Sequence, residues 1–180
     1  VGRTGEGSHP GSLRHTNSRG GANPAGALMD IVTDRPVIDV DFCARHDTHT
    51  GIQRVVREVM PLWSAGHDTV LVAHTSPSAA YRELIPKERE RVLSYGSKAT
   101  TRPTGPPPRL VVPWRTTVVM PDVVAARSVA GLAALAEFSG NQVALVGYDM
   151  IPLISTELRP IEEADVFAHY LRLVKHSHRV

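Results

Sequence analysis

The sequence predicts an α/β fold in which a parallel, Rossmann-like sheet carries helices on both of its faces. Short β-branched runs alternate along the chain with longer amphipathic segments, the pattern of βαβ units. The run at residues 142–149 is apolar over most of its length, as expected for a strand in a sheet covered on both faces. With 42% hydrophobic and 21% charged residues, the 180-residue chain has globular composition, and its length suits one domain.

Residues 1–34 differ in composition from the rest of the chain. They are rich in Gly, Ser, Asn and Pro and contain few apolar side chains. Ordering a residue costs about 1–2 kcal/mol of backbone entropy, which buried apolar area must offset. We therefore expect a disordered tail over residues 1–34 and one folded domain over residues 35–180.

The first strand and helix of the domain have clear signals. Residues 37–42 alternate apolar and acidic side chains and predict a strand, followed by a polar turn over residues 44–49. Thr50 and Gln53 have the spacing of a capping box, and Gly66 is a suitable stop for the helix that Thr50 opens. The predicted buried stripe of this helix consists of Ile52, Val55, Val56, Val59 and Met60.

The remaining elements continue the alternation of strands and helices. We expect strands at residues 68–74, 111–112, 117–120 and 142–149, helices at residues 81–94 and 125–138 and from Pro160 onward, and an irregular proline-rich loop at residues 97–109. Residues 179–180, after the last helix, look like the approach to another strand.

Two turns at predicted strand ends are candidate sites, because ligands of open α/β sheets bind outside the carboxyl ends of the strands. At residues 47–54, the start of a helix would present backbone N–H groups to an anion, with Gly51 allowing close approach and Arg54 adding donors. The alternative is a well-capped structural helix. At residues 148–153, Asp149 follows a buried strand and could hold a hydroxyl, take a proton, or cap the turn.

Several classes of function are not supported by the sequence. Asp39 and Asp41 lie in the predicted first strand rather than at a strand end, with no third ligand nearby, so we expect no metal site. The single cysteine, Cys43, excludes an intramolecular disulfide and a cysteine-rich zinc site. No GxGxxG follows the first strand and no P-loop occurs, and the net charge of +2 suggests no nucleic-acid partner. No apolar run is long enough to span a membrane, and we expect a cytoplasmic protein.

Residues 49–58, which read HTGIQRVVRE, resemble the segment that opens the first helix in bacterial retaining glycosyltransferases of the GT-B type, family GT4. Shorter segments follow in the same order and are similar to later parts of that family: residues 81–84, 118–122, 148–153 and 167–171. The resemblance spans residues 37–180.

This resemblance implies the N-terminal, acceptor-side half of a GT-B fold. It implies transfer of a hexose, with retention and without metal or cofactor, from a nucleotide-diphosphate sugar to a hydroxyl of a glycan or lipid-linked acceptor. Peripheral membrane association is compatible with such an acceptor. Asp149 and Tyr148 would lie near the reacting sugar, and Tyr148 stands where the family has histidine. The implied substrate-binding residues are Thr50, Gly51, Ile52, Gln53, Arg54 and Pro152.

The chain departs from the family in length. The donor-binding second domain, with its pair of glutamates eight positions apart, is absent from these 180 residues. We therefore expect a fragment, a remnant or one part of a split enzyme, which would be inactive alone. The alternative is a non-catalytic interaction module that pairs with a separate donor-binding subunit, and an unrelated α/β enzyme such as a small hydrolase also stays open.

Overall fold

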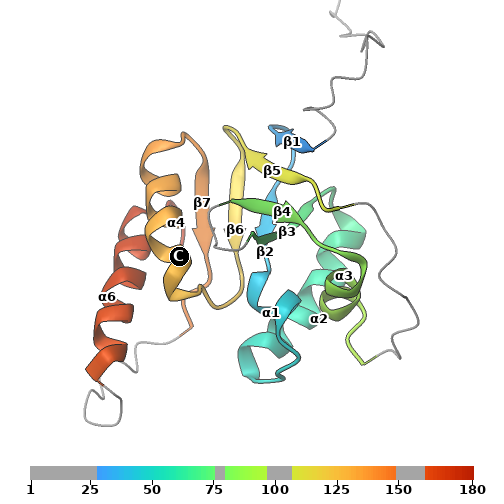
Figure 1. Cartoon of the computed structure of the whole chain (residues 1–180), viewed down its shortest axis with the longest axis horizontal. Helices are drawn as coiled ribbons and strands as arrows, with labels where there is room; N and C mark the ends of the chain where they lie inside the picture. The colour runs from blue at the N-terminus through green and yellow to red at the C-terminus, as the bar shows by residue number, and fades with distance from the viewer. Residues whose placement is uncertain (1–27, 76–79, 97–106, 149–160) are drawn as a thin grey trace, which may run out of the picture.

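A computed structural model of the chain describes residues 28–75, 80–96, 107–148 and 161–180, and it contains one seven-stranded, mostly parallel sheet with helices on both faces (Figure 1). The predicted fold class is confirmed. The strands are β1 (Met29–Val32), β2 (Val37–Asp39), β3 (Val70–His74), β4 (Tyr81–Glu83), β5 (Leu110–Pro113), β6 (Thr117–Met120) and β7 (Gln142–Leu145). The helices are α1 (Asp41–Arg45), α2 (Gly51–Gly66), α3 (Pro86–Leu93), α4 (Ala126–Phe138) and α6 (Ile161–His176).

The order of the strands is β1-β5-β4-β3-β2-β6-β7. Strand β2 pairs in parallel with β3 on one side and with β6 on the other, and Ile38 lies opposite both Leu71 and Val119. The chain leaves β2 toward β3, whereas it leaves β6 toward β7 in the opposite direction. The topological switch point, where open α/β sheets bind ligands, therefore lies between the carboxyl ends of β2 and β6.

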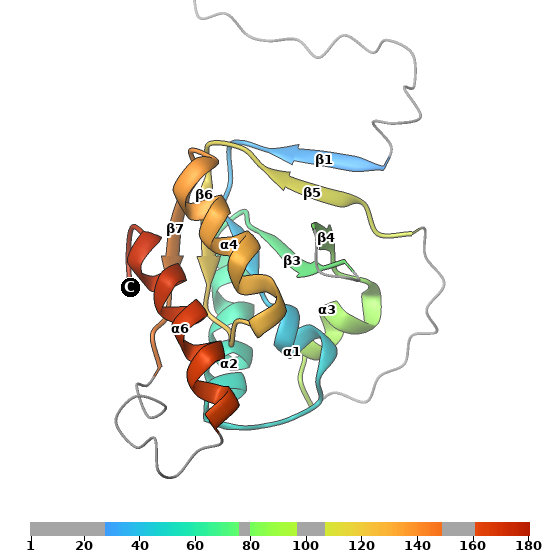
Figure 2. The same cartoon turned by 60° about the vertical axis from the view of Figure 1, so that its left-hand side comes forward.

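Helices cover the two faces of the sheet unequally. Helices α4 and α6 pack on one face, and α1, α2 and α3 pack on the other (Figures 1 and 2). Successive residues of β2 show the alternation, since Val37 belongs to the core under α4 whereas Ile38 belongs to the core under α2. Among the described residues, no helix is long and apolar enough to cross a membrane.

The tail is shorter than expected at its carboxyl end. Residues 29–32 form edge strand β1, which pairs in parallel with β5, so the prediction of a tail reaching residue 34 is wrong there; residues 1–27 lie outside the described residues. Strand β1 contributes Val32 to the core but exposes the opposite face. Apolar side chains cover this outer face of β1, β5 and the turn after it: Met29, Ile31, Leu110, Val112 and Trp114.

The first strand ends earlier than predicted. Strand β2 stops at Asp39, and residues 41–45, expected as strand and turn, form the short helix α1. Asp41 in its first turn and Arg45 in its last form an i,i+4 ion pair, with Arg45 Nε 2.6 Å from Asp41 Oδ1. This charge order suits the helix dipole and favours a helical turn over an extended strand.

Residues 81–94 do not form one helix, and that prediction is wrong. Tyr81–Glu83 form β4, antiparallel to both β3 and β5, and α3 begins only at Pro86. Proline disfavours the α conformation in the residue before it, and it is well placed at the first position of a helix. The helix therefore starts at the proline and leaves the preceding residues to the sheet.

Helix α2 matches its predicted bounds but not its predicted buried face. The capping box of Thr50 and Gln53 forms, with the Thr50 N–H donating to Gln53 Oε1 at 3.2 Å, and the helix ends at Gly66. Its buried residues are Gln53, Val56, Arg57 and Met60. Val55 and Val59, expected in the core, are exposed, because buried Gln53 and Arg57 occupy that stripe instead.

The other elements lie where the sequence predicts them, apart from their ends. Strand β7 stops at Leu145 rather than at residue 149. After α6, Arg179 forms a parallel bridge with Ala144 of β7, with its N–H donating to Val143 O at 3.2 Å. The prediction that residues 179–180 approach a strand position is therefore supported at Arg179.

Candidate functional site

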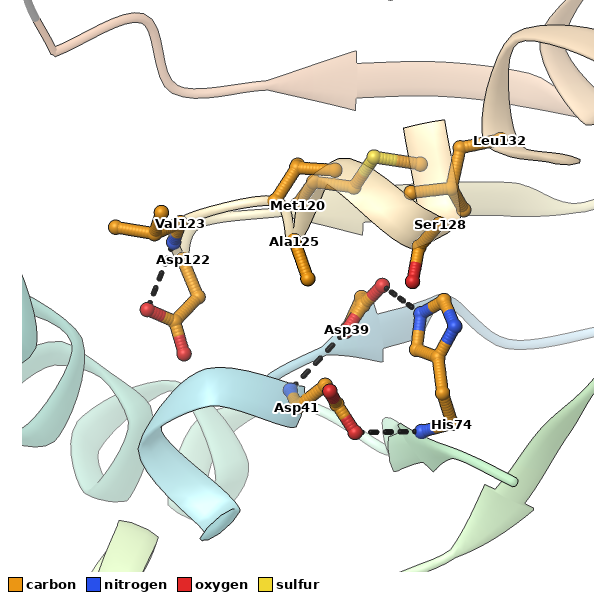
Figure 3. A pocket seen from close by; sticks show the side chains of 10 residues that line it. Asp39, Asp41, His74, Met120, Asp122, Val123, Ala125, Ser128 and Leu132 are labelled. Atoms are coloured by element: carbon orange, nitrogen blue, oxygen red, sulfur yellow. Dashed lines mark hydrogen bonds and ion pairs between the residues drawn. The ribbon is translucent and has the colours of Figure 1, made fainter. Parts of the chain in front are cut away.

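A group of buried polar side chains lies at the switch point of the sheet. Asp39 ends β2, Asp41 begins α1, His74 ends β3, and Asp122 follows β6 (Figure 3). All four side chains are buried, and they surround a cavity of about 10 Å³, room for about one water molecule. Polar side chains are rarely buried without a structural or chemical role.

His74 and Asp39 form a buried pair. His74 Nε2 lies 2.7 Å from Asp39 Oδ2, and the edge of the His74 ring also meets the Tyr81 ring, with centroids 4.9 Å apart. Burial lowers the pKa of His74, but the hydrogen bond to Asp39 and the charges of Asp39 and Asp41 outweigh it and raise the pKa above its ordinary value. A histidine held this way can hold or exchange a proton with a bound hydroxyl.

Asp41 fixes the geometry of this pair. Its Oδ1 accepts a hydrogen bond from the His74 backbone N–H at 2.8 Å, and its own N–H donates to Asp39 Oδ1 at 3.1 Å. Arg45 binds Asp41 Oδ1, and Arg127 approaches Oδ2 at 3.6 Å. The two arginines balance the charge of Asp41, so this carboxylate positions β2 and β3 rather than facing a ligand.

Asp122 connects the turn after β6 to α1. Its Oδ2 accepts from the Cys43 N–H at 2.6 Å, and its Oδ1 accepts from the Val123 N–H at 2.8 Å. Burial raises the pKa of Asp122, although both N–H hydrogen bonds act against the increase. Burial, followed by the charge of Asp122, raises the pKa of the Cys43 thiol, so this cysteine is a poor nucleophile.

Among the described residues, the buried Ser128 Oγ in the first turn of α4 has no hydrogen-bond partner, whereas the buried Tyr81 hydroxyl in β4 approaches the carboxylate of Asp39. Figure 3 shows the Ser128 hydroxyl pointing toward the Asp39–His74 pair. Burial raises the pKa of Tyr81, followed by the charge of Asp39, the hydrogen bond to Asp39 and the charge of Asp41, so the hydroxyl stays protonated and is a hydrogen-bond donor. Unpaired buried hydroxyls are costly, and they commonly mark the place of a bound polar group.

A larger pocket of about 230 Å³ adjoins the site. His74, Ser128 and Leu132 line both the small cavity and this pocket. Among the described residues, no group of three or more His, Cys, Asp or Glu side chains could hold a metal ion. The arrangement is suited to bind a hydroxyl-bearing ligand through hydrogen bonds.

The predicted turn at residues 47–54 lies apart from these pockets. Thr50, Gly51 and Arg54 are exposed, Ile52 is half-buried, and Gln53 is buried. A Cβ placed on Gly51 would meet no atom within 4 Å, so a ligand can approach the backbone here. The turn is open, as a site at the start of α2 requires.

Arg57, within the same segment, has a structural role that the sequence did not indicate. Its guanidinium donates to the carbonyls of Thr48 and His46, the latter at 2.7 Å, and lies 4.0 Å from the centroid of the Tyr95 ring. Buried Arg57 therefore holds the loop that leads into α2.

The second predicted turn is only partly described. The Tyr148 hydroxyl donates to the Pro121 carbonyl, and burial, followed by the charge of Asp122, raises the pKa of Tyr148. Tyr148 thus lies beside the switch-point site, but its hydroxyl is engaged by the backbone. Asp149 and Pro152 lie outside the described residues.

Sequence reasoning missed most of the switch-point site. The sequence predicts Asp39 and Asp41 within a strand, whereas Asp39 ends β2 and Asp41 begins α1, both beside the small cavity. The position of two other polar residues in the sequence could have indicated this site. His74 and Asp122 come at the ends of the apolar runs of β3 and β6. Ser128 and Tyr81 carried no such signal, because only the tertiary fold brings them beside His74.

The chain matches no protein family, no curated protein and no solved structure. Its function must therefore be inferred from the geometry of these sites and from the resemblance of residues 49–58.

Proposed function

We propose that this chain is the acceptor-side domain of a glycosyltransferase that moves a hexosyl group from a nucleotide-diphosphate sugar to a hydroxyl acceptor, with retention. The observation that carries the proposal is the open turn at the start of α2. Gly51 has free space around it, Arg54 is exposed one helical turn into α2, and the turn lies in the segment that resembles the GT4 family. A diphosphate is the kind of anion that a glycine-bearing helix start and an arginine can bind together.

In this proposal the donor's other contacts come from a second lobe, because the 180 residues contain no pair of glutamates eight positions apart, as the family's donor-binding domain has. The donor is a substrate, and the proposal needs no resident cofactor. In this proposal Tyr148 and Asp149 lie near the transferred sugar, and Pro152 belongs to the substrate-binding residues. The isolated chain should bind a nucleotide diphosphate weakly and transfer no sugar.

Binding of UDP to the chain, followed by ³¹P NMR, tests this proposal. Arg54→Met and Gly51→Val should each weaken UDP binding at least about fivefold, since a charge-assisted hydrogen bond contributes roughly 1.5–3 kcal/mol. Arg172→Met, which removes an exposed arginine on α6, is the matched control and should leave binding unchanged. Equal loss of binding in the control, or no change in Arg54→Met, would overturn the assignment of this turn.

A second candidate function is an interaction module that pairs with a separate donor-binding subunit. One observation favours it: Val55, Val59 and Leu62 expose an apolar stripe along α2, next to the open turn, and Leu62 is 77% exposed. Adding a purified donor-binding lobe distinguishes the two candidates. Transfer activity restored by the mixture supports a split enzyme, whereas stable association without transfer supports a non-catalytic module.

A further inference from the structure

The pocket beside the switch-point site lies in a part of the sheet face that α4 leaves open. Helices α4 and α6 cover this face over β6 and β7, whereas β5, β4 and β3 extend past α4 (Figures 1 and 2). The pocket of about 230 Å³ is bounded by Tyr81 of β4, Val111 and Pro113 of β5, and Gly131 and Leu132 of α4. We call it the α4 groove.

The lining of the α4 groove is divided into an apolar part and a polar part. Val111, Pro113, Leu132 and Leu135 form apolar walls. The polar part adjoins the small cavity of Figure 3, because His74 and Ser128 line both spaces. Tyr81 lies directly opposite His74 across the antiparallel β3–β4 pair, so its hydroxyl belongs to the same part.

The polar part has a hydroxyl that the protein does not use. Ser128 Oγ is buried without a hydrogen-bond partner among the residues that the structure describes, and beside it the Tyr81 hydroxyl faces Asp39. Ser128 is only 4% exposed and Tyr81 only 5%. The unpaired Ser128 hydroxyl and the buried His–Asp pair beside it provide a donor and acceptors for a single oxygen atom, whereas the apolar walls provide none.

We infer that the α4 groove binds the acceptor of the proposed transferase, and that this acceptor is an apolar molecule carrying a hydroxyl, rather than a polyhydroxylated glycan. The hydroxyl lies among Ser128, Tyr81 and His74, and the apolar body lies against Val111 and Leu132. A glycan would leave many of its hydroxyls unpaired against these walls, which is costly. The inference deepens the proposed function and rests on it.

The size of the groove limits the part of the ligand that enters it. A cavity of about 150 Å³ lined by apolar side chains holds a benzene molecule. The α4 groove, at about 230 Å³, therefore accommodates one ring with a short chain. 4-Propylphenol is a suitable probe, and propylbenzene, which differs only by lacking the hydroxyl, is its matched control ligand.

The test is a titration of the full ¹⁵N-labelled chain with each probe, followed by amide chemical shifts. We expect 4-propylphenol to shift the amides of Ser128, Gly131 and Val111 and to bind about tenfold more tightly than propylbenzene, the factor expected for one good hydrogen bond. Ser128→Ala should reduce this preference while retaining propylbenzene binding. Equal affinity for the two probes, or no binding of either, would overturn the inference.

Gly131 allows the groove to be filled without disturbing the fold. A Cβ at this position meets no atom within 4 Å, and glycine is unfavourable inside a helix. Gly131→Leu should therefore keep the thermal unfolding temperature at or above that of the unmodified chain and weaken 4-propylphenol binding at least tenfold. Ala130→Leu, at an exposed neighbouring position of α4, should bind as the unmodified chain does. Unchanged binding in Gly131→Leu would place the ligand elsewhere and contradict the inference.

The outcomes separate this inference from the proposed function. A chain that binds 4-propylphenol in the groove but shows no Arg54-dependent UDP binding would uphold the groove and overturn the transferase assignment. A chain that binds UDP as proposed and, with a donor lobe, glycosylates glycans but not phenols would overturn the groove inference alone.

Discussion

His74 and Asp39 come together from neighbouring parallel strands, with the imidazole Nε2 2.7 Å from the carboxylate Oδ2 and both side chains buried. Burial alone would leave the histidine neutral. The carboxylate reverses this preference, and the pKa of His74 rises. The pair lies at the polar end of the α4 groove, where a ligand hydroxyl would meet it.

The stability of the chain should depend on pH through this pair. Folding raises the pKa of His74, so the folded chain binds the His74 proton more tightly than the unfolded chain does. The resulting gain in the free energy of unfolding is fully present below the ordinary histidine pKa of about 6.5 and is lost as pH rises through the raised value. Asp39→Asn should therefore lower the free energy of unfolding by about 3 kcal/mol at about pH 6 and by less at about pH 8.5. Urea unfolding followed by tryptophan fluorescence measures both values. An equal cost at the two pH values would contradict the prediction.

Ser128 and Asn141 are both buried polar residues, yet their removal should have opposite effects. Ser128→Ala removes an unpaired hydroxyl and should leave the free energy of unfolding unchanged or raise it by up to about 1 kcal/mol. Asn141→Ala should lower it by about 2–4 kcal/mol, because Asn141 accepts from the Thr116 N–H at 2.9 Å and donates to the Pro113 carbonyl at 3.0 Å. Thermal unfolding of the two variants gives the comparison, and similar losses in both would show that Ser128 is engaged within the protein.

Arg57 and Arg54 lie three positions apart on α2 and should separate structure from binding. Arg57→Met should lower the free energy of unfolding by about 3 kcal/mol and accelerate hydrogen exchange over residues 43–48, since it removes the buried guanidinium that binds the loop carbonyls of His46 and Thr48. Arg54→Met, at an exposed position, should change stability by less than about 0.5 kcal/mol. A stability loss of similar size in both would mean that the turn is part of the structural framework and not a binding surface.

Asp122 should also make stability depend on pH, through burial rather than through an ion pair. Burial raises the pKa of Asp122, so the folded chain holds the proton of this carboxyl more tightly than the unfolded chain does. The gain that Asp122 makes to the free energy of unfolding therefore falls as pH rises through the raised value. The unmodified chain should therefore exceed Asp122→Asn in stability by more at about pH 4 than at pH 7. Asp122→Ala, which leaves the Cys43 and Val123 N–H groups unpaired, should cost about 2–4 kcal/mol at pH 7. Urea unfolding at the two pH values tests both expectations.

The sequence was sufficient for the fold because the fold depends on periodic patterns. The apolar runs of β3 and β6 and the capped helix α2 are local features, and each lies where its pattern predicts. The errors occurred where tertiary contacts decide the outcome. Tyr81 joins a sheet because β3 and β5 are both available to pair with it, and Arg57 is buried because the loop that leads into α2 offers it carbonyl groups.

The switch-point site was less predictable for the same reason. Asp39 and His74 are 35 positions apart, and only the parallel pairing of β2 with β3 brings them into contact. A polar residue at the end of an apolar strand was visible in the sequence. Whether it would meet a partner, a cavity or solvent depends on the strand order, which periodicity does not reveal.

The outer strands have a consequence for handling the protein. Met29 lies beside Leu110, and Ile31 lies beside Val112, so these exposed side chains form two adjoining apolar rows. Strand β1 is at the edge of the sheet, and its outer backbone groups pair with no further strand of the described chain. Such edges promote self-association in concentrated solution. Ile31→Lys should keep the purified chain monodisperse at concentrations where the unmodified chain aggregates, as light scattering would reveal.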